Sequence, residues 1–144
     1  MRGYDAGKKV KGRKRHIAVD VMGMVIELEV TGADMQDRDG AVLLFKNLNG
    51  GERTRLAQAV LDSAYRGETV AQAAQNIDIL IITRRDDQKK GEFKVQPIRW
   101  IVERTFAWFN QARRLFKDVE KTVESSKAMI YLAMIRLMLR RLAS

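Results

Sequence analysis

Carboxylates are the side chains of this sequence whose type best suits them to chemistry. The chain has no cysteine, which excludes disulfides, thiolate zinc sites and cysteine nucleophiles. The single histidine, His16, leaves no histidine-rich metal site and argues against a Ser-His-Asp triad. Any metal ion must therefore bind through Asp and Glu oxygens, which hard divalent cations prefer.

Asp62 is the first candidate because it follows an apolar segment, residues 55–61, that we expect to be a buried strand, although its Ala and Gln residues would also allow a helix. In open α/β sheets, functional sites form at the carboxyl ends of the strands. The alternative is that Asp62 caps the next helix or forms an Asx turn. Position alone favours the second interpretation.

Glu103 is the second candidate, on an expected helix that begins at Pro97. At 100° per residue, Glu103 shares one helical stripe with Arg99, Asn110 and Arg114, so it is a lone acid among cations and an amide. The alternative is an ordinary exposed (i, i+4) pair between Arg99 and Glu103, which spacing alone favours.

Other conspicuous residues have simpler interpretations. Asp20 lies beside an expected hairpin turn, where Asp commonly serves the backbone, and we expect it to be structural. His16 flanks a basic segment and suits a backbone or phosphate contact better than a catalytic base. Trp100 and Trp108 stand at helical spacing, which is more typical of a core than of a base-stacking surface.

The elements that must position these residues follow from periodicity. Alternating apolar residues predict a β-hairpin over 17–30 with its turn at Met22-Gly23 and one buried face that includes Val21 and Ile26. The further expected elements are a helix at 41–48, a strand at 55–61, a helix at 69–75, a central strand at 77–82, a helix from Pro97 whose core face is Ile98, Ile101, Thr105, Phe109, Ala112 and Phe116, and a helix capped by Ser125 that ends at Leu142. This order predicts an α/β fold with a mixed sheet flanked by helices.

The charge of the chain indicates a polyanionic partner. Its 144 residues carry 27 Lys and Arg against 18 Asp and Glu, a formal net charge of +9. Such an excess favours nucleic acid. Residues 1–15 hold six cations within eight positions, and their glycines predict an irregular basic arm ahead of a domain over 16–144. We expect a cytoplasmic protein, because no signal peptide or membrane-spanning stretch is visible.

Several strings together resemble one family, the DDE transposases of bacterial insertion sequences, which carry a ribonuclease H-like catalytic fold. The matching strings are RGYDAGKKVKGRKRHIAVD, GADMQDRDGA, LDSAYRG, RWIVERTFAWF with ARRL behind it, and ESSKAMIYLAMIRLMLRRL. The resemblance places the family's second catalytic Asp on Asp62, within D-x-x-Y-x-G, and its catalytic Glu on Glu103, within R-x-x-x-E-R. It also implies two Mg²⁺ or Mn²⁺ ions held by three carboxylates, Asp62 and Glu103 among them.

The chain departs from the family pattern in two places. Gln96 and Asn110 stand where the wider signature has Tyr and Lys, and Arg113 and Arg114 are candidates to substitute. The family's first catalytic Asp precedes the GYDAGKK segment, so the chain resembles the C-terminal part of a transposase that lacks its N-terminal strand. Asp20 falls on the following hairpin and is not counted as that ligand.

The resemblance implies DNA cleavage followed by strand transfer, with a homo-oligomer or a partner chain supplying the N-terminal part. The alternative is a non-catalytic DNA-binding fragment or truncated remnant, and an RNA-binding protein is less well supported because no RNA-binding motif is present. We expect the following cations to neutralise DNA phosphates: Lys8, Lys9, Lys11, Arg13, Lys14, Arg15, Arg66, Arg99, Arg104, Arg113 and Arg114.

Overall fold

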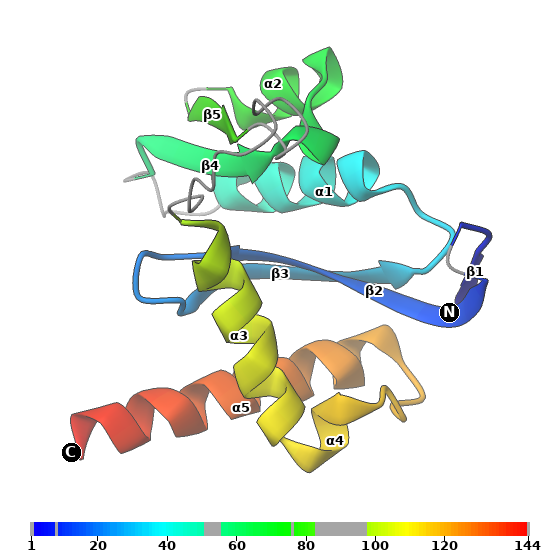
Figure 1. Cartoon of the computed structure of the whole chain (residues 1–144), viewed down its shortest axis with the longest axis vertical. Coiled ribbons are helices and arrows are strands. Elements are labelled where there is room, and N and C mark those ends of the chain that lie inside the picture. Colours follow the sequence, from blue (N-terminus) through cyan, green and yellow to red (C-terminus); the bar gives the residue numbers. More distant parts are fainter. Residues whose placement is uncertain (1, 8, 51–55, 76, 83–97, 144) are drawn as a thin grey trace, which may run out of the picture.

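The computed structural model describes residues 2–7, 9–50, 56–75, 77–82 and 98–143 (Figure 1). Its elements, in chain order, are β1 (Gly3–Asp5), β2 (Val10–Val19), β3 (Val25–Gly32), α1 (Asp37–Gly50), β4 (Gln58–Asp62), the 3₁₀ turn η1 (Ser63–Tyr65), α2 (Glu68–Ala74), β5 (Asp78–Ile82), α3 (Arg99–Gln111), α4 (Arg113–Phe116) and α5 (Val123–Leu142). The expected α/β class is confirmed. Pro97 and Gln96 lie outside the described residues.

The expected hairpin is present as β2 and β3, but it is longer than its alternation predicts. β2 begins at Val10, and the short β1 pairs with its first residues, from Gly3 opposite Gly12 to Asp5 opposite Val10. The prediction of an irregular arm over residues 1–15 is therefore wrong. The glycines do not prevent regular structure there, because antiparallel pairing satisfies their backbone groups.

The hairpin contains a bulge, and the expectation of one buried face is therefore wrong. The register shifts between Ala18 and Val19, so that Ala18 lies opposite Glu27 while Val19 lies opposite Val25. Ile26 is thereby placed on the face opposite to Leu28 rather than beside it. Val21, expected on the buried face, is exposed at the turn.

Two cores use the two faces of this three-stranded sheet, which lies between layers of helices (Figure 1). On one face, Leu28 and Val30 pack with Phe109 of α3 and Ile130 of α5. On the other, Ile26 packs against a cluster centred on Phe45 and further apolar residues of α1, α2 and the second sheet. Because both faces are covered, β3 is apolar on both sides near the turn.

The second sheet consists of β4 and β5, which run parallel with Asp62 opposite Ile82. Helix α2 connects them, as a parallel pair requires. The described strands thus form two sheets, so the expectation of one mixed sheet with 77–82 as its central strand is corrected. Within the described ranges, β5 pairs with β4 alone.

The C-terminal helices depart from the expected core face after Phe109. Ile101, Thr105 and Phe109 are buried as predicted, but α3 ends at Gln111 and α4 begins at Arg113. After this break Phe116 faces solvent and is 77% exposed, and Ile98, ahead of α3, is exposed as well. The N-cap of α5 is Thr122, whose hydroxyl accepts from the backbone N–H of Ser125, and not Ser125 itself.

Candidate active site

Asp62 lies at the carboxyl end of β4, and its two carboxylate oxygens have different partners. Oδ1 accepts from the hydroxyl of Ser63 at 3.1 Å and from the backbone N–H of Ala64 at 3.3 Å, which caps the following 3₁₀ turn. Oδ2 faces the guanidinium of Arg99, with Nη1 3.4 Å away. The capping interpretation is therefore correct for one oxygen, while the other is directed towards α3.

Arg99 joins Asp62 to Glu103. Its Nε donates to Glu103 Oε1 at 3.2 Å, one turn along α3, while its Nη1 reaches Asp62. The (i, i+4) pair expected from spacing is confirmed. No local pattern indicates that the same guanidinium also bridges to β4, because Asp62 and Arg99 are 37 positions apart. A positive group thus lies between the two carboxylates that the family motifs single out.

The side chains at this cluster are of the type that binds a divalent cation, but among the described residues there are too few of them to hold one. Asp62 and Glu103 offer hard oxygen donors around one positive group, and no soft ligand competes in a chain without cysteine. Within residues 2–7, 9–50, 56–75, 77–82 and 98–143, however, no group of three or more Asp, Glu, His or Cys side chains is arranged to hold a metal ion. The two carboxylates therefore fit as part of a metal site and need a further ligand.

Tyr65 belongs to the same local structure. It follows Asp62 in the D-x-x-Y-x-G element and packs against the α1 core. Burial, with smaller contributions from Asp37 and Asp62, raises the pKa of Tyr65. The phenol of Tyr65 therefore stays neutral at neutral pH. Tyr65 packs against the α1 cluster next to the turn that Asp62 caps.

Asp20 has the turn role expected of it. Its Oδ1 accepts from the backbone N–H groups of Met22 and Met24 at 2.9 and 2.8 Å. Gly23, at φ 81°, provides the left-handed conformation that this turn needs. One oxygen of the Asp20 carboxylate is thus occupied by the hairpin backbone.

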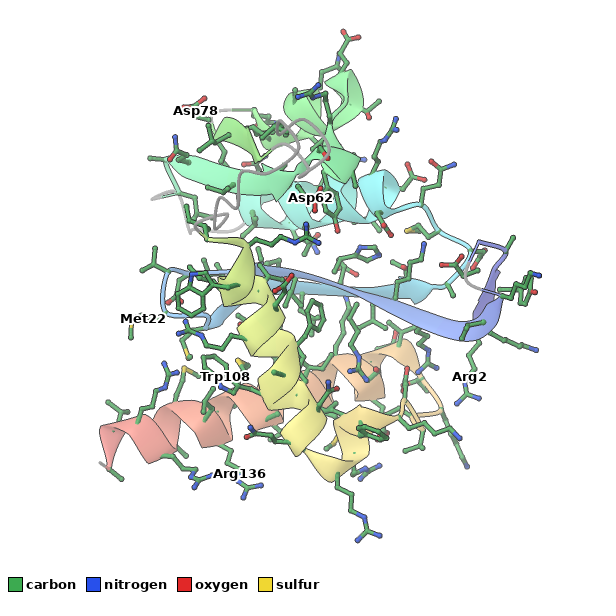
Figure 2. All side chains as sticks on the ribbon, viewed as in Figure 1. Arg2, Met22, Asp62, Asp78, Trp108 and Arg136 are labelled. Atoms are coloured by element: carbon green, nitrogen blue, oxygen red, sulfur yellow. The ribbon has the colours of Figure 1, made fainter. Side chains whose placement is uncertain are left out.

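The two residues that follow Glu103 on α3 form hydrogen bonds to the tip of the β2–β3 hairpin. Arg104 Nη2 donates to the carbonyl of Met22 at 2.9 Å, and Thr105 Oγ1 donates to the carbonyl of Gly23 at 2.8 Å. The Arg104 guanidinium also lies over the rings of Trp100 and Trp108, 4.4 and 4.9 Å from their centroids. These contacts fix α3 against the hairpin, and Figure 2 shows Met22 and Trp108 on neighbouring elements there.

This placement bears on two expectations. The phosphate contact expected of Arg104 stays a prediction, and its guanidinium contacts two indoles and a backbone carbonyl. The expectation that Trp100 lies in the core is wrong, because Trp100 is half exposed. The pair of tryptophans serves to hold Arg104.

Three further cations expected to face DNA are used inside the molecule. Arg13 pairs with Asp118 at 3.1 Å and donates to the carbonyls of Glu120 and Lys121. Lys14 lies 3.3 Å from Asp37 and donates to the carbonyl of Met35. Arg15 donates to the carbonyl of Leu115. The sequence could not separate these residues from their neighbours, because all six belong to one basic run.

The other expected DNA contacts divide by exposure. Lys8 lies outside the described residues. Arg114, on α4, pairs with Glu120 at 2.6 Å. Because α3 ends at Gln111, Arg114 does not continue the helical stripe of Glu103. The remaining expected cations are exposed and have no acidic partner within the described part of the chain: Lys9, Lys11, Arg66 and Arg113.

His16 is buried rather than in contact with a phosphate. Its Nε2 shares a hydrogen bond of 3.0 Å with Thr31 Oγ1, and its ring lies against Gly40 of α1 so closely that any Cβ there would overlap it. Burial lowers the pKa of His16, an effect partly offset by Asp37. His16 is therefore a neutral packing residue.

Comparison with known proteins agrees with these motifs. The family described as "Transposase DDE domain" matches residues 1–138. A putative transposase for insertion sequence element IS402 from Burkholderia cepacia is 30% identical over 129 residues, which cover 84% of this chain. The chain spans about 60% of the length of that relative. No solved structure matches.

Among the described residues, no helix combines the length and the apolar character that crossing a membrane requires. The match over residues 1–138 includes both elements that meet at Arg99, the strand end with Asp62 and the helix with Glu103. The chain belongs to the DDE domain family of transposases.

Proposed function

We propose that this chain is the catalytic part of an insertion-sequence transposase, which cleaves DNA strands at the element ends and transfers the freed 3′-hydroxyls to target DNA. The observation that carries the proposal is the Arg99 guanidinium held between Asp62 and Glu103. Two acids from separate elements converge there, and a metal-dependent phosphodiester reaction uses such oxygen donors to hold its ions.

The residues that would hold divalent ions are Asp62 and Glu103. Bound Mg²⁺ or Mn²⁺ activates the attacking oxygen and stabilises the departing one. The cap made by Ser63 and Ala64 fixes one oxygen of Asp62 and thereby directs the other outward. Arg99, released when its acidic partners take up cations, would bind a phosphate of the DNA strand through its guanidinium.

In the first step, a water oxygen forms a bond to phosphorus and the P–O3′ bond breaks, which leaves a 3′-hydroxyl and a 5′-phosphate. In the second step, that 3′-hydroxyl forms a bond to a target phosphorus and a target 3′-oxygen leaves. One set of side chains serves both steps, since each is a displacement at a phosphodiester.

We further propose that the two sheets are halves of one ribonuclease H-like sheet. Residues 13–19 of β2 have a strand partner on the β3 side alone, and β4 pairs with β5 alone, within the described residues. A strand inserted between β2 and β4 would pair with both. It would bring the third carboxylate beside Asp62, and a partner chain or another part of the protein would supply it.

The test is Mn²⁺-dependent nicking of supercoiled plasmid by the chain with the strand between β2 and β4 supplied in trans, beside Glu103→Gln and Asp62→Asn. The matched control is Glu68→Gln, an exposed acid on α2 away from Arg99. Nicking that disappears in both site variants and survives in the control supports the proposal. Nicking that survives in Glu103→Gln contradicts it.

The second candidate function is a DNA-binding fragment without catalysis. The observation that favours it is the incomplete ligand set among the described residues, where two carboxylates meet and three are needed. Salt-sensitive DNA binding without nicking, even when the N-terminal strand is supplied in trans, would establish this second function.

A further inference from the structure

A basic cavity lies on the molecule away from the Asp62–Arg99–Glu103 cluster. It has a volume of about 680 Å³ and is lined by Arg2, Lys11, Arg13, Val119, Glu120 and Lys121. Figure 2 shows Arg2 beside β1, at a distance from Asp62 in the plane of the view. We call these lining residues the β1–β2 cavity.

The β-pairing brings the cations of the cavity together. Lys11 and Arg13 point to the same face of β2 because side chains alternate along a strand. Arg2 lies one residue beyond the Gly3–Gly12 pair and donates from Nη2 to the carbonyl of Asp118. Arg13 binds the carbonyls of Glu120 and Lys121, which holds the segment between α4 and α5 against β2.

The acids near the cavity are already neutralised. Asp118 contacts Arg13 through both carboxylate oxygens. Glu120 is buried, with one oxygen on Arg114 and the other on the hydroxyl of Ser125. Arg2, Lys11 and Lys121 are exposed and have no acidic side-chain partner in the part of the chain that the structure describes. The rim of the cavity is therefore positive, while the charge beneath it is balanced.

We propose that the β1–β2 cavity binds the phosphodiester backbone of duplex DNA, as a contact separate from the carboxylate cluster. The inference rests on the proposed function for its choice of DNA over other polyanions. Arg13 serves as the fixed floor of the cavity, and Arg2, Lys11 and Lys121 contact phosphates. Such contacts carry affinity without sequence preference.

The experiment measures binding of a short labelled duplex by the whole chain across a salt series in EDTA, so that cutting plays no part. The test variant is the double substitution Lys11→Ala with Lys121→Ala. The control, Arg136→Ala with Arg140→Ala, removes the same charge from exposed positions on α5. Loss of two phosphate contacts should reduce the slope of log K against log salt by about 1.8 and weaken binding roughly tenfold or more at 0.1 M salt.

An equal loss in the test and control variants would overturn the proposal, because net charge alone would then explain it. An unchanged salt slope in the test variant would also overturn it. A further arm uses single-stranded RNA of the same length, and a loss confined to RNA would assign the cavity to a different nucleic acid. In a last arm, inorganic phosphate competes at constant ionic strength, and displacement of DNA at low millimolar phosphate would indicate a site for the free ion.

The outcome is separable from that of the proposed function. Asp62→Asn and Glu103→Gln should bind the duplex with wild-type affinity or more tightly in this assay, because both remove negative charge without touching the cavity. A chain that never cuts DNA can still show the slope change, and a chain that cuts DNA can lack it.

Discussion

Two arginine–carboxylate clusters in this chain use the same residue types and differ in burial. The Arg13 side chain is 2% exposed, and its guanidinium is shared among Asp118 and two backbone carbonyls. The Arg99 side chain is 52% exposed, and its partner Glu103 is 66% exposed. A buried pair is fixed because breaking it leaves a desolvated charge, whereas an exposed pair exchanges partners at little cost. Burial thus makes the first cluster a scaffold and leaves the second able to accept other ions.

The largest expected effect is that of Arg13→Ala on stability. It removes the partner of Asp118 and two hydrogen bonds to the α4–α5 segment, so unfolding should become easier by about 3–5 kcal/mol. Chemical denaturation followed by circular dichroism measures this. Lys11→Ala, two residues away and exposed, is the matched control and should change stability by less than about 0.5 kcal/mol. Equal effects of the two substitutions would remove the distinction between the clusters.

A smaller effect is expected from the titration of His16, which lies on β2 beside the Arg13 cluster. Burial lowers its folded-state pKa below the ordinary 6.5, so the unfolded chain binds the proton more readily. Its contribution to stability is complete above pH 6.5 and is lost as the pH falls through the lower folded-state value. The free energy of unfolding should rise with pH just below 6.5.

The comparison for this titration is His16→Gln, measured by denaturation at several pH values. The variant is expected to be less stable at all of them because it loses the packing against Gly40 and Thr31. Its pH slope in that window should nevertheless be flatter than that of the wild type. A slope identical to that of the wild type would mean that other groups carry the titration.

The smallest expected effect on stability is that of Arg99→Gln. The exposed pairs with Asp62 and Glu103 are each worth about 0–1 kcal/mol, so unfolding should barely change. The same substitution should tighten Mn²⁺ binding severalfold, because the ion no longer competes with a guanidinium for the two carboxylates. Calorimetric titration tests this, with Arg66→Gln as the exposed control. Weaker Mn²⁺ binding in Arg99→Gln would show that the two acids do not form the ion site.

Much of the fold could be predicted because its periodicities are local. The alternation over 17–30, the helix around Phe45 and the positions of Ile101, Thr105 and Phe109 all follow from side-chain spacing. The bulge at Ala18/Val19 could not be predicted, because an extra residue in a strand leaves the composition unchanged. The burial of Arg13 depends on Asp118, 105 positions away, and no local pattern indicates such a partner.

The candidate site was predicted in part. Asp62 and Glu103 were chosen from motifs, and the structure places both on one guanidinium, which neither motif states. For the basic residues, the expected DNA contacts stay predictions. A run of cations indicates a polyanion partner as a whole, but it does not show which members turn inward, because that depends on where acids and carbonyls lie in the folded chain.

The bulge has a consequence for the gene. Because Ile26 is the extra residue opposite the Ala18/Val19 step, loss of its single codon would restore simple alternation, with Val25 still on the face of Leu28 and Glu27 still opposite Ala18. The hairpin tip would keep its carbonyls on Arg104 and Thr105, and the cluster around Phe45 would lose one apolar side chain. Loss of a codon from the regularly paired residues 28–31 would instead move the residues between it and the turn to the other face of the sheet. Length variation in this strand is therefore expected at the bulge and excluded along the regular pairing.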